Sequence, residues 1–163
     1  MASGGTLLIF TPLHNEPPTS NYATLDLRNQ HPVLDFDSST NEAAVFSAVM
    51  PRNYDGGGVT VYLHYAMSSA TSGTVDWDVA FERIGEQQQD IDIDGFASAK
   101  SADDNAVPAT CGHVDVVSLA LSGGAEIDNI AVGDAFRVKV SRDAVSDTAS
   151  GDAELVAVEL KET

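Results

Sequence analysis

Val59-Thr-Val-Tyr-Leu-His-Tyr-Ala-Met67 and Thr74-Val-Asp-Trp-Asp-Val-Ala-Phe-Glu-Arg-Ile84 are the stretches that decide the fold of this chain. In both, apolar side chains recur at every second position, which is the period of a strand with one buried and one wet face. Residues 135–142 repeat the pattern. Only small residues, 68–73, separate the first two stretches, so we predict that they pair as a hairpin.

Outward from these stretches, alternation and turn signals predict further strands. They are expected at 6–11, 22–28, 33–36, 43–50, 114–121 and 153–160, with one short strand inside 85–106. The stretch 43–50 is apolar on both faces, which favours a central buried strand or, alternatively, a short helix, and 125–132 suits a helical turn. Eight to ten strands predict an all-β, two-sheet antiparallel β-sandwich with jelly-roll or Greek-key connections. A closed eight-stranded barrel is the alternative, because strand spacing does not separate the two.

The chain of 163 residues has the length of one domain. Pro12, Pro17 and Pro18 disfavour a sheet interior, so residues 1–21 are predicted to form an extended N-terminal arm or edge segment, and residues 22–163 the sandwich domain. The N-terminus has no basic region, and the apolar run 7–10 is too short for a signal peptide or a membrane span. We therefore expect folding in a cytoplasm and no membrane partner.

The formal net charge is −17, from 25 acidic and 8 basic residues. Such a field repels phosphate backbones, which argues against a nucleic-acid partner and favours a surface that keeps the protein soluble. A surface for cations or for a basic partner, or adaptation to salty water, are the alternatives. Cys111 is the single cysteine, so an internal disulfide and a cysteine-based zinc site are excluded.

Asp90-Ile-Asp-Ile-Asp94-Gly95 matches the first half of a calcium-binding loop, and Asp90, Asp92 and Asp94 are therefore the candidate metal ligands. The twelfth position, where such a loop needs a bidentate glutamate, is Ser101. The alternative is a strand-like segment with the three aspartates in water and the isoleucines facing inward.

Asp76 and Asp78 flank Trp77 and are expected on the wet face, as solubilising charges rather than as an acid–base or metal pair, with Trp77 in the core. The four histidines have no metal-ligand spacing, and no nucleophile elbow, phosphate loop or dinucleotide fingerprint is present. The sequence therefore predicts a protein that is not an enzyme, with no catalytic residues and no cofactor. A small hydrolase is an alternative without a supporting motif.

Three longer stretches resemble a known group of proteins: residues 22–36, residues 50–61, with the run Met50-Pro-Arg-Asn-Tyr-Asp-Gly-Gly-Gly-Val-Thr-Val61, and residues 151–162. Together they resemble small jelly-roll virion structural proteins of tailed bacteriophages, namely head-decoration (cement) proteins and related tail-spike or fibre modules. The resemblance implies a location in the virion. It also implies a major capsid protein or other virion proteins as partners.

On this resemblance, we expect a capsid decoration protein, trimeric on a phage head, with residues 1–21 as its docking arm. Deleting that arm is then expected to abolish head binding while the domain still folds. The alternative is a receptor- or glycan-binding module of a tail fibre or spike. For that role Tyr54, Tyr62 and Tyr65 are candidate sugar platforms, although packing in the sheets is the plainer interpretation of all three.

Overall fold

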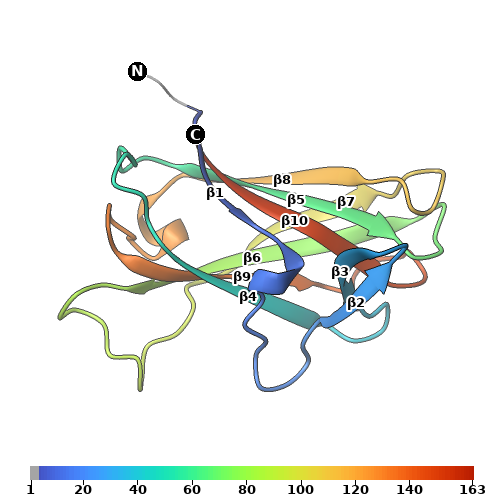
Figure 1. The fold of residues 1–163 in the computed structure, drawn as a ribbon, viewed down its shortest axis with the longest axis horizontal. Coiled ribbons are helices and arrows are strands. Elements are labelled where there is room, and N and C mark those ends of the chain that lie inside the picture. Colours follow the sequence, from blue (N-terminus) through green and yellow to red (C-terminus); the bar gives the residue numbers. More distant parts are fainter. Residues whose placement is uncertain (1–3) are drawn as a thin grey trace.

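The computed structural model describes residues 4–163, and within them the chain forms ten strands and two short 3-10 turns (Figure 1). In chain order the elements are β1 (Thr6–Phe10), η1 (Pro12–His14), β2 (Thr24–Arg28), β3 (His31–Phe36), β4 (Glu42–Val49), β5 (Val59–Met67), β6 (Thr74–Ile84), β7 (Lys100–Ala106), β8 (Asp115–Leu121), η2 (Gly124–Ile127), β9 (Ala135–Arg142) and β10 (Ala153–Glu162). No helix within the described range is long and apolar enough to cross a membrane.

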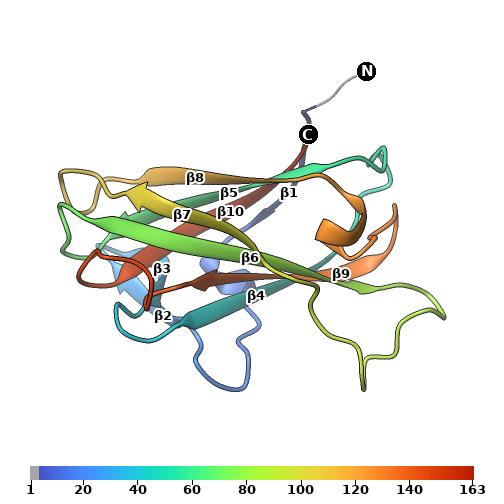
Figure 2. The same ribbon diagram turned by 180° about the vertical axis from the view of Figure 1, so that it is seen from behind.

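The strands form two antiparallel sheets that pack face to face as a sandwich (Figure 2). Sheet A has the order β2-β3-β10-β5-β8, with β1 also pairing with β10, and sheet B has the order β4-β9-β6-β7. Strands that are neighbours in a sheet are often far apart in the chain, as when Thr60 of β5 faces Lys161 of β10. The predicted fold class, an all-β antiparallel sandwich of the jelly-roll type, is confirmed.

The core lies between the sheets and is built by the predicted alternation. Val61 and Leu63 of β5 and Val79 and Phe81 of β6 are fully buried. Trp77 is also fully buried, as predicted, and it makes edge-to-face contacts with aromatic rings of sheet A, its ring centroid lying 5.4 Å from that of Tyr65. Burial of alternate side chains from both sheets is the main force that holds the two layers together.

Two predictions about strand pairing are wrong. The stretches 59–67 and 74–84 are strands with the predicted bounds, but β5 belongs to sheet A and β6 to sheet B, so they do not form a hairpin. The small residues 68–73 instead carry the chain from one sheet to the other. The strand at 42–49 lies at the end of sheet B rather than in its centre. It is buried because the segment 15–23 runs beside it, where Glu16 N donates to Val45 O at 2.7 Å and Ala23 N to Ala43 O at 3.0 Å.

The N-terminal segment is part of the sandwich's edge. Strand β1 pairs antiparallel with β10, and Phe10 at its end is buried in the core. The following turn η1 and the segment 15–23 then cross to β4 of sheet B. Residues 6–23 therefore link the two sheets along one side of the molecule.

Candidate functional site

The hairpin of β2 and β3 forms one wall of a hollow, which we call the hairpin pocket. The two strands are joined by Asn29 and Gln30, whose φ angles are 46° and 67°. Two positive φ values are typical of the type I′ turn, whose twist matches that of the strands it joins. Arg28 and His31 face each other across the hairpin and lie on its outward face.

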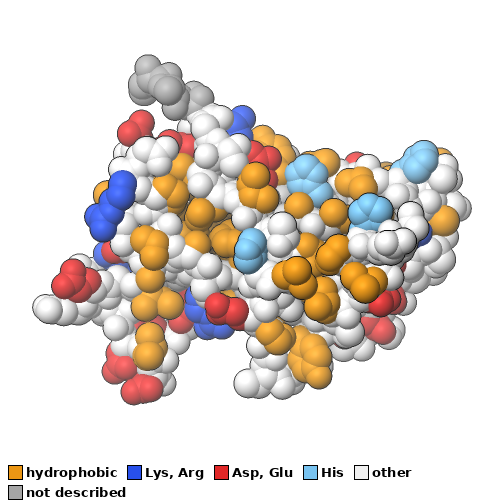
Figure 3. Space-filling model, in the orientation of Figure 1, with side chains coloured by type: hydrophobic (Ala, Val, Ile, Leu, Met, Phe, Trp, Pro, Cys, Tyr) orange, Lys and Arg blue, Asp and Glu red, His pale blue; other side chains and the backbone are white. Residues whose placement is uncertain are grey.

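The hairpin pocket has a volume of about 350 Å³ and lies on the outward face of sheet A. Its floor is aliphatic and its rim is polar. The floor is formed by Val33, Ala66, Val114 and Val156, and the rim by Arg28, Asn29, His31, Glu154 and the backbone at Gly112. The lining thus comes from β2, β3, β5, β10 and the loop before β8. Figure 3 shows hydrophobic side chains and histidines grouped over the side of the molecule that carries these elements.

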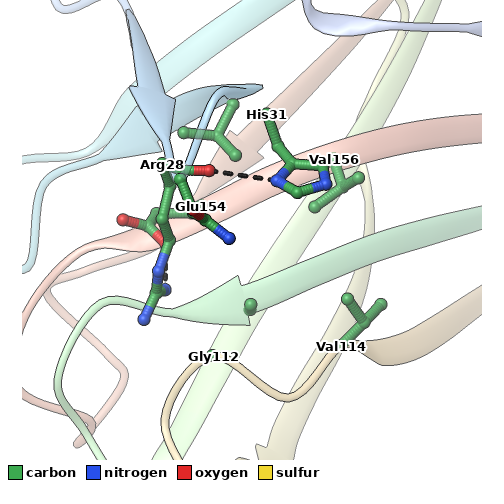
Figure 4. A pocket seen from close by; sticks show the side chains of 9 residues that line it. Arg28, His31, Gly112, Val114, Glu154 and Val156 are labelled. Atoms are coloured by element: carbon green, nitrogen blue, oxygen red, sulfur yellow. Dashed lines mark hydrogen bonds and ion pairs between the residues drawn. The ribbon is translucent and has the colours of Figure 1, made fainter.

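An ion pair between Arg28 and Glu154 orders the rim (Figure 4). Arg28 Nη1 donates to Glu154 Oε2 and also to the carbonyl oxygen of Met67 at 2.9 Å. His31 is held by a contact of 3.2 Å between its Nδ1 and the carbonyl oxygen of Arg28. Among residues 4–163, the ion pair and the bond to Met67 use only Nη1 of the guanidinium, so Nε and Nη2 stay available to a ligand. Because these bonds fix the polar groups before any ligand arrives, the pocket is pre-formed.

Asp35 lies next to this ion pair, in surroundings that disfavour a charged carboxylate. It faces Glu154 across the β3–β10 pair, and no group within residues 4–163 donates to its buried Oδ1. Burial, followed by the charges of Glu154, Asp26 and Asp152, raises the pKa of Asp35 from 3.8 to about 6, although Arg28 acts in the opposite direction. A carboxylate in this position therefore carries an unfavourable charge at neutral pH.

We expect Asp35→Asn to stabilise the protein at neutral pH. When folding raises the pKa of an acid, ionisation of that acid destabilises the folded state. The loss of stability is absent below the unfolded-state pKa, grows between the two pKa values and is complete above the folded-state pKa. A shift from 3.8 to about 6, discounted for the exposed part of the side chain, corresponds to about 1 kcal/mol. Urea unfolding from pH 3.5 to pH 8 should show this gain above about pH 6 and no gain below about pH 4.

Asp92→Asn is the matched control, because Asp92 is exposed and the substitution changes the net charge equally. An equal gain in that variant, or a gain in Asp35→Asn that does not change with pH, would contradict this account.

The predicted calcium ligands lie in the loop between β6 and β7. Asp90, Asp92 and Asp94 are all exposed, and Asp90 Oδ1 accepts a bond from the backbone N of Asp92 at 3.0 Å. Nowhere in the part of the chain that the structure describes do three or more His, Cys, Asp or Glu side chains gather so that they could hold a metal ion. Ile91 and Ile93 are exposed, so they do not face inward as the alternative interpretation required. Calcium binding here stays a prediction from the sequence.

The other carboxylates and the tyrosines also differ from expectation. Asp78 is half-exposed, but Asp76 is buried beside β7, where the backbone N of Asp104 donates to its Oδ1 at 2.7 Å. The prediction of a wet face is therefore wrong for Asp76. Tyr54 and Tyr65 are buried in the core and cannot serve as sugar platforms, and Tyr62 is half-buried on the outward face of β5.

The residues of the hairpin pocket could not be identified as a site from the sequence. Arg28 and Glu154, whose side chains pair, are 126 positions apart, and neither belongs to a motif. The one local signal is the composition of residues 29–32, which is typical of a turn but does not indicate the rim of a site. A polar pair at opposite ends of a chain can be identified only when the order of the strands in the sheet is known.

No protein-family model and no curated protein matches this sequence. Solved structures do match its fold. A family 35 carbohydrate-binding module from an environmental isolate aligns with a TM-score of 0.54 and 11% identity, over 94% of this chain and 92% of that one. The xylan-binding module CBM15 aligns with a TM-score of 0.50 and 8% identity, over 96% of this chain and 97% of that one. The fold is therefore the β-sandwich found in carbohydrate-binding modules, and at these identities the likeness establishes the fold alone.

This finding corrects the resemblance drawn from the sequence. The interpretation of the chain as a virion structural or capsid decoration protein of tailed phages is wrong, because the two solved structures described above, which match its fold over more than 90% of both chains, are carbohydrate-binding modules. The quoted runs, such as residues 50–61, carry turn glycines and strand alternation, which any β-sandwich needs. The capsid partner, the trimer and the virion location were implied by that resemblance, and they stay predictions without support from the structure.

Proposed function

We propose that this domain is a non-catalytic glycan-binding module and that the hairpin pocket is its binding site. This is the alternative that the sequence analysis named beside a structural virion role. The prediction that the protein is not an enzyme agrees with the carbohydrate-binding modules that share its fold. The observation that carries the proposal is an aliphatic floor bordered by the Arg28–Glu154 ion pair.

The chemistry of the rim suits sugar hydroxyls. A hydroxyl both donates and accepts hydrogen bonds, so adjacent hydroxyls are best met by a donor and an acceptor side by side. Arg28 offers free guanidinium donors, and Glu154 beside it offers carboxylate acceptors. Since the two charges compensate each other, the rim favours a neutral polar ligand over an ion.

The floor suits the other surface of a sugar ring. The C–H groups of a pyranose form an apolar face, and Val33, Val114 and Val156 present an apolar surface to it. Val114 is more than half exposed, so the floor is accessible from solvent. A hollow of about 350 Å³ lies within the ordinary size range of small-ligand sites, about 300–1,000 Å³. It has room for a chain end or a side-branch sugar.

The test is binding to a panel of soluble polysaccharides based on xylose, glucose, mannose and galactose, measured by affinity electrophoresis and calorimetry. At least one polymer is expected to bind. His31→Ala, which removes a rim group, and Val114→Glu, which places a charge on the floor, should each weaken binding about tenfold, the equivalent of one lost hydrogen bond or desolvated contact.

His113→Ala is the control, because His113 is an exposed histidine outside the lining. It should bind like the unaltered protein. The proposal fails if no polymer in the panel binds, or if both pocket variants bind as tightly as the control.

A further inference from the structure

Strand β2 ends sheet A, and no strand within residues 4–163 pairs with its outer edge. The backbone N of Leu27 donates to the carboxylate Oδ1 of its own neighbour, Asp26, at 2.7 Å, so this amide points to the free edge instead of to β3. Free edges attract further strands, and proteins protect them in identifiable ways. At the other sheet ends, segment 15–23 covers β4, and β7 and β8 lie against each other.

The inward face of β2 is apolar and uncovered. Leu25 faces Leu34, whose side chain is in the core, so Leu25 and Leu27 point to the inner side of the sheet. They are nevertheless 52% and 65% exposed, because β2 packs chiefly against β3 and extends past sheet B. Leu13 and Tyr22 are also exposed and line one shallow hollow together with Leu25, and Figure 3 shows hydrophobic side chains gathered over η1 and β2. We call these four residues, Leu13, Tyr22, Leu25 and Leu27, the edge patch.

The charges of β2 favour one partner, a second copy of the same strand. Antiparallel pairing about a two-fold axis at Leu27 would place Asp26 opposite Arg28 of the second copy, and Arg28 opposite its Asp26. Both residues lie on the outward face, where opposite charges directly across a strand pair stabilise it. Nη1 of Arg28 stays bonded to Glu154 and Met67, so Nε and Nη2 are the atoms that would meet Asp26 of the second copy. An axis at Asp26 would instead bring two aspartates together, which is destabilising. The sequence of β2 is therefore self-complementary in one register.

We propose that the protein forms a two-fold homodimer through antiparallel pairing of β2 with β2, centred on Leu27. The pairing joins the two A sheets into one continuous sheet and brings the leucines of both copies together on its inward face. The outward amide of Leu27 then donates to a backbone carbonyl of the second copy. Each chain carries a charge of −17, so the uncharged edge patch is a region where two copies can approach.

The first test is the mass of the purified protein in solution, from size-exclusion chromatography with light scattering over a concentration series. We expect twice the 17.1 kDa of one chain. Leu27→Lys should give a monomer, since it places two like charges at the axis. Ile91→Lys is the control, because Ile91 is an equally exposed apolar residue in the loop between β6 and β7, and it should stay dimeric.

The second test determines the register in which the two β2 strands pair. In a Cys111→Ser background, which removes the native exposed thiol, Leu27→Cys should form an interchain disulfide on mild oxidation. Directly opposed residues have Cα atoms about 5.5 Å apart, which suits a disulfide. Leu25→Cys should crosslink much less, because Leu25 faces Asn29 in this register. A monomeric mass at every concentration, a Leu27→Lys variant that stays dimeric, or equal crosslinking at both positions would overturn the proposal.

Discussion

Replacing Asp147 by alanine is expected to destabilise the protein by about 3–5 kcal/mol, because it leaves a charge buried without a partner. The charge belongs to Arg142 at the end of β9, which is completely buried. Its Nε donates to Asp147 Oδ2 at 2.6 Å, and its Nη2 to Asp147 Oδ1 at 3.2 Å. The side chain of Asp147 is itself only 2% exposed, so water does not replace it easily.

Arg142 also joins the two sheets. Its guanidinium donates to the carbonyl oxygens of Phe36 in β3, Ala149 and Gly151, at 3.1, 2.9 and 2.8 Å. These bonds attach the loop between β9 and β10 to sheet A, and together with Asp147 they satisfy the buried cation. Without Asp147, the carbonyl oxygens alone must hold a full positive charge in a low-dielectric core, which is why the cost is large.

The measurement is the free energy of unfolding from urea denaturation at neutral pH. Asp103→Ala on the exposed face of β7 is the control and should change stability by less than about 0.5 kcal/mol. The double variant Arg142→Met with Asp147→Leu should recover only part of the loss, because it removes both charges but leaves the carbonyl oxygens of Phe36, Ala149 and Gly151 without their donor. A loss below about 1 kcal/mol in Asp147→Ala would show that the pair is not the buried anchor described here.

Phe10→Ala is expected to cost about 3–5 kcal/mol, as does removal of other large aromatic side chains from protein cores. Phe10 is only 5% exposed and stacks on Phe46 of β4, with ring centroids 5.3 Å apart. This contact is one of the few in which β1 itself holds sheet A to sheet B. Ile9 is the matched control, since it is the neighbouring residue, points to the other face and is 60% exposed. Ile9→Ala should lie within about 0.5 kcal/mol of the unaltered protein.

The same experiment tests the sequence-based expectation that residues 1–21 can be deleted while the domain still folds. In the structure this deletion removes β1, Phe10 and the backbone bond from Glu16 to Val45 of β4, so we expect the truncated chain to unfold at much lower urea concentrations. An unchanged unfolding midpoint in both Phe10→Ala and the truncated chain would instead support the prediction that residues 1–21 form an independent arm.

Much of the fold could be predicted because strand formation is a local property. Residues 59–67 and 74–84 alternate so regularly that their bounds agree with β5 and β6. Pairing is different, since the backbone groups that join strands are the same in every residue. The short connection 68–73 is compatible with a hairpin and with a crossing between sheets, and the packing of the whole core selects the crossing. Position in a sheet is decided in the same way, as the burial of β4 by residues 15–23 shows.

An acidic β-sandwich with Trp77 in its core can be predicted from the residues alone, because alternation, turn residues and charge act on neighbouring positions. Which strands are neighbours follows from the packing of the two sheets, and so do the Arg28–Glu154 pair at the rim of the pocket and the burial of Asp76. Long-range contacts depend on the joint packing of two complete sheets, so the distant partner of a residue cannot be inferred from the short stretch around it.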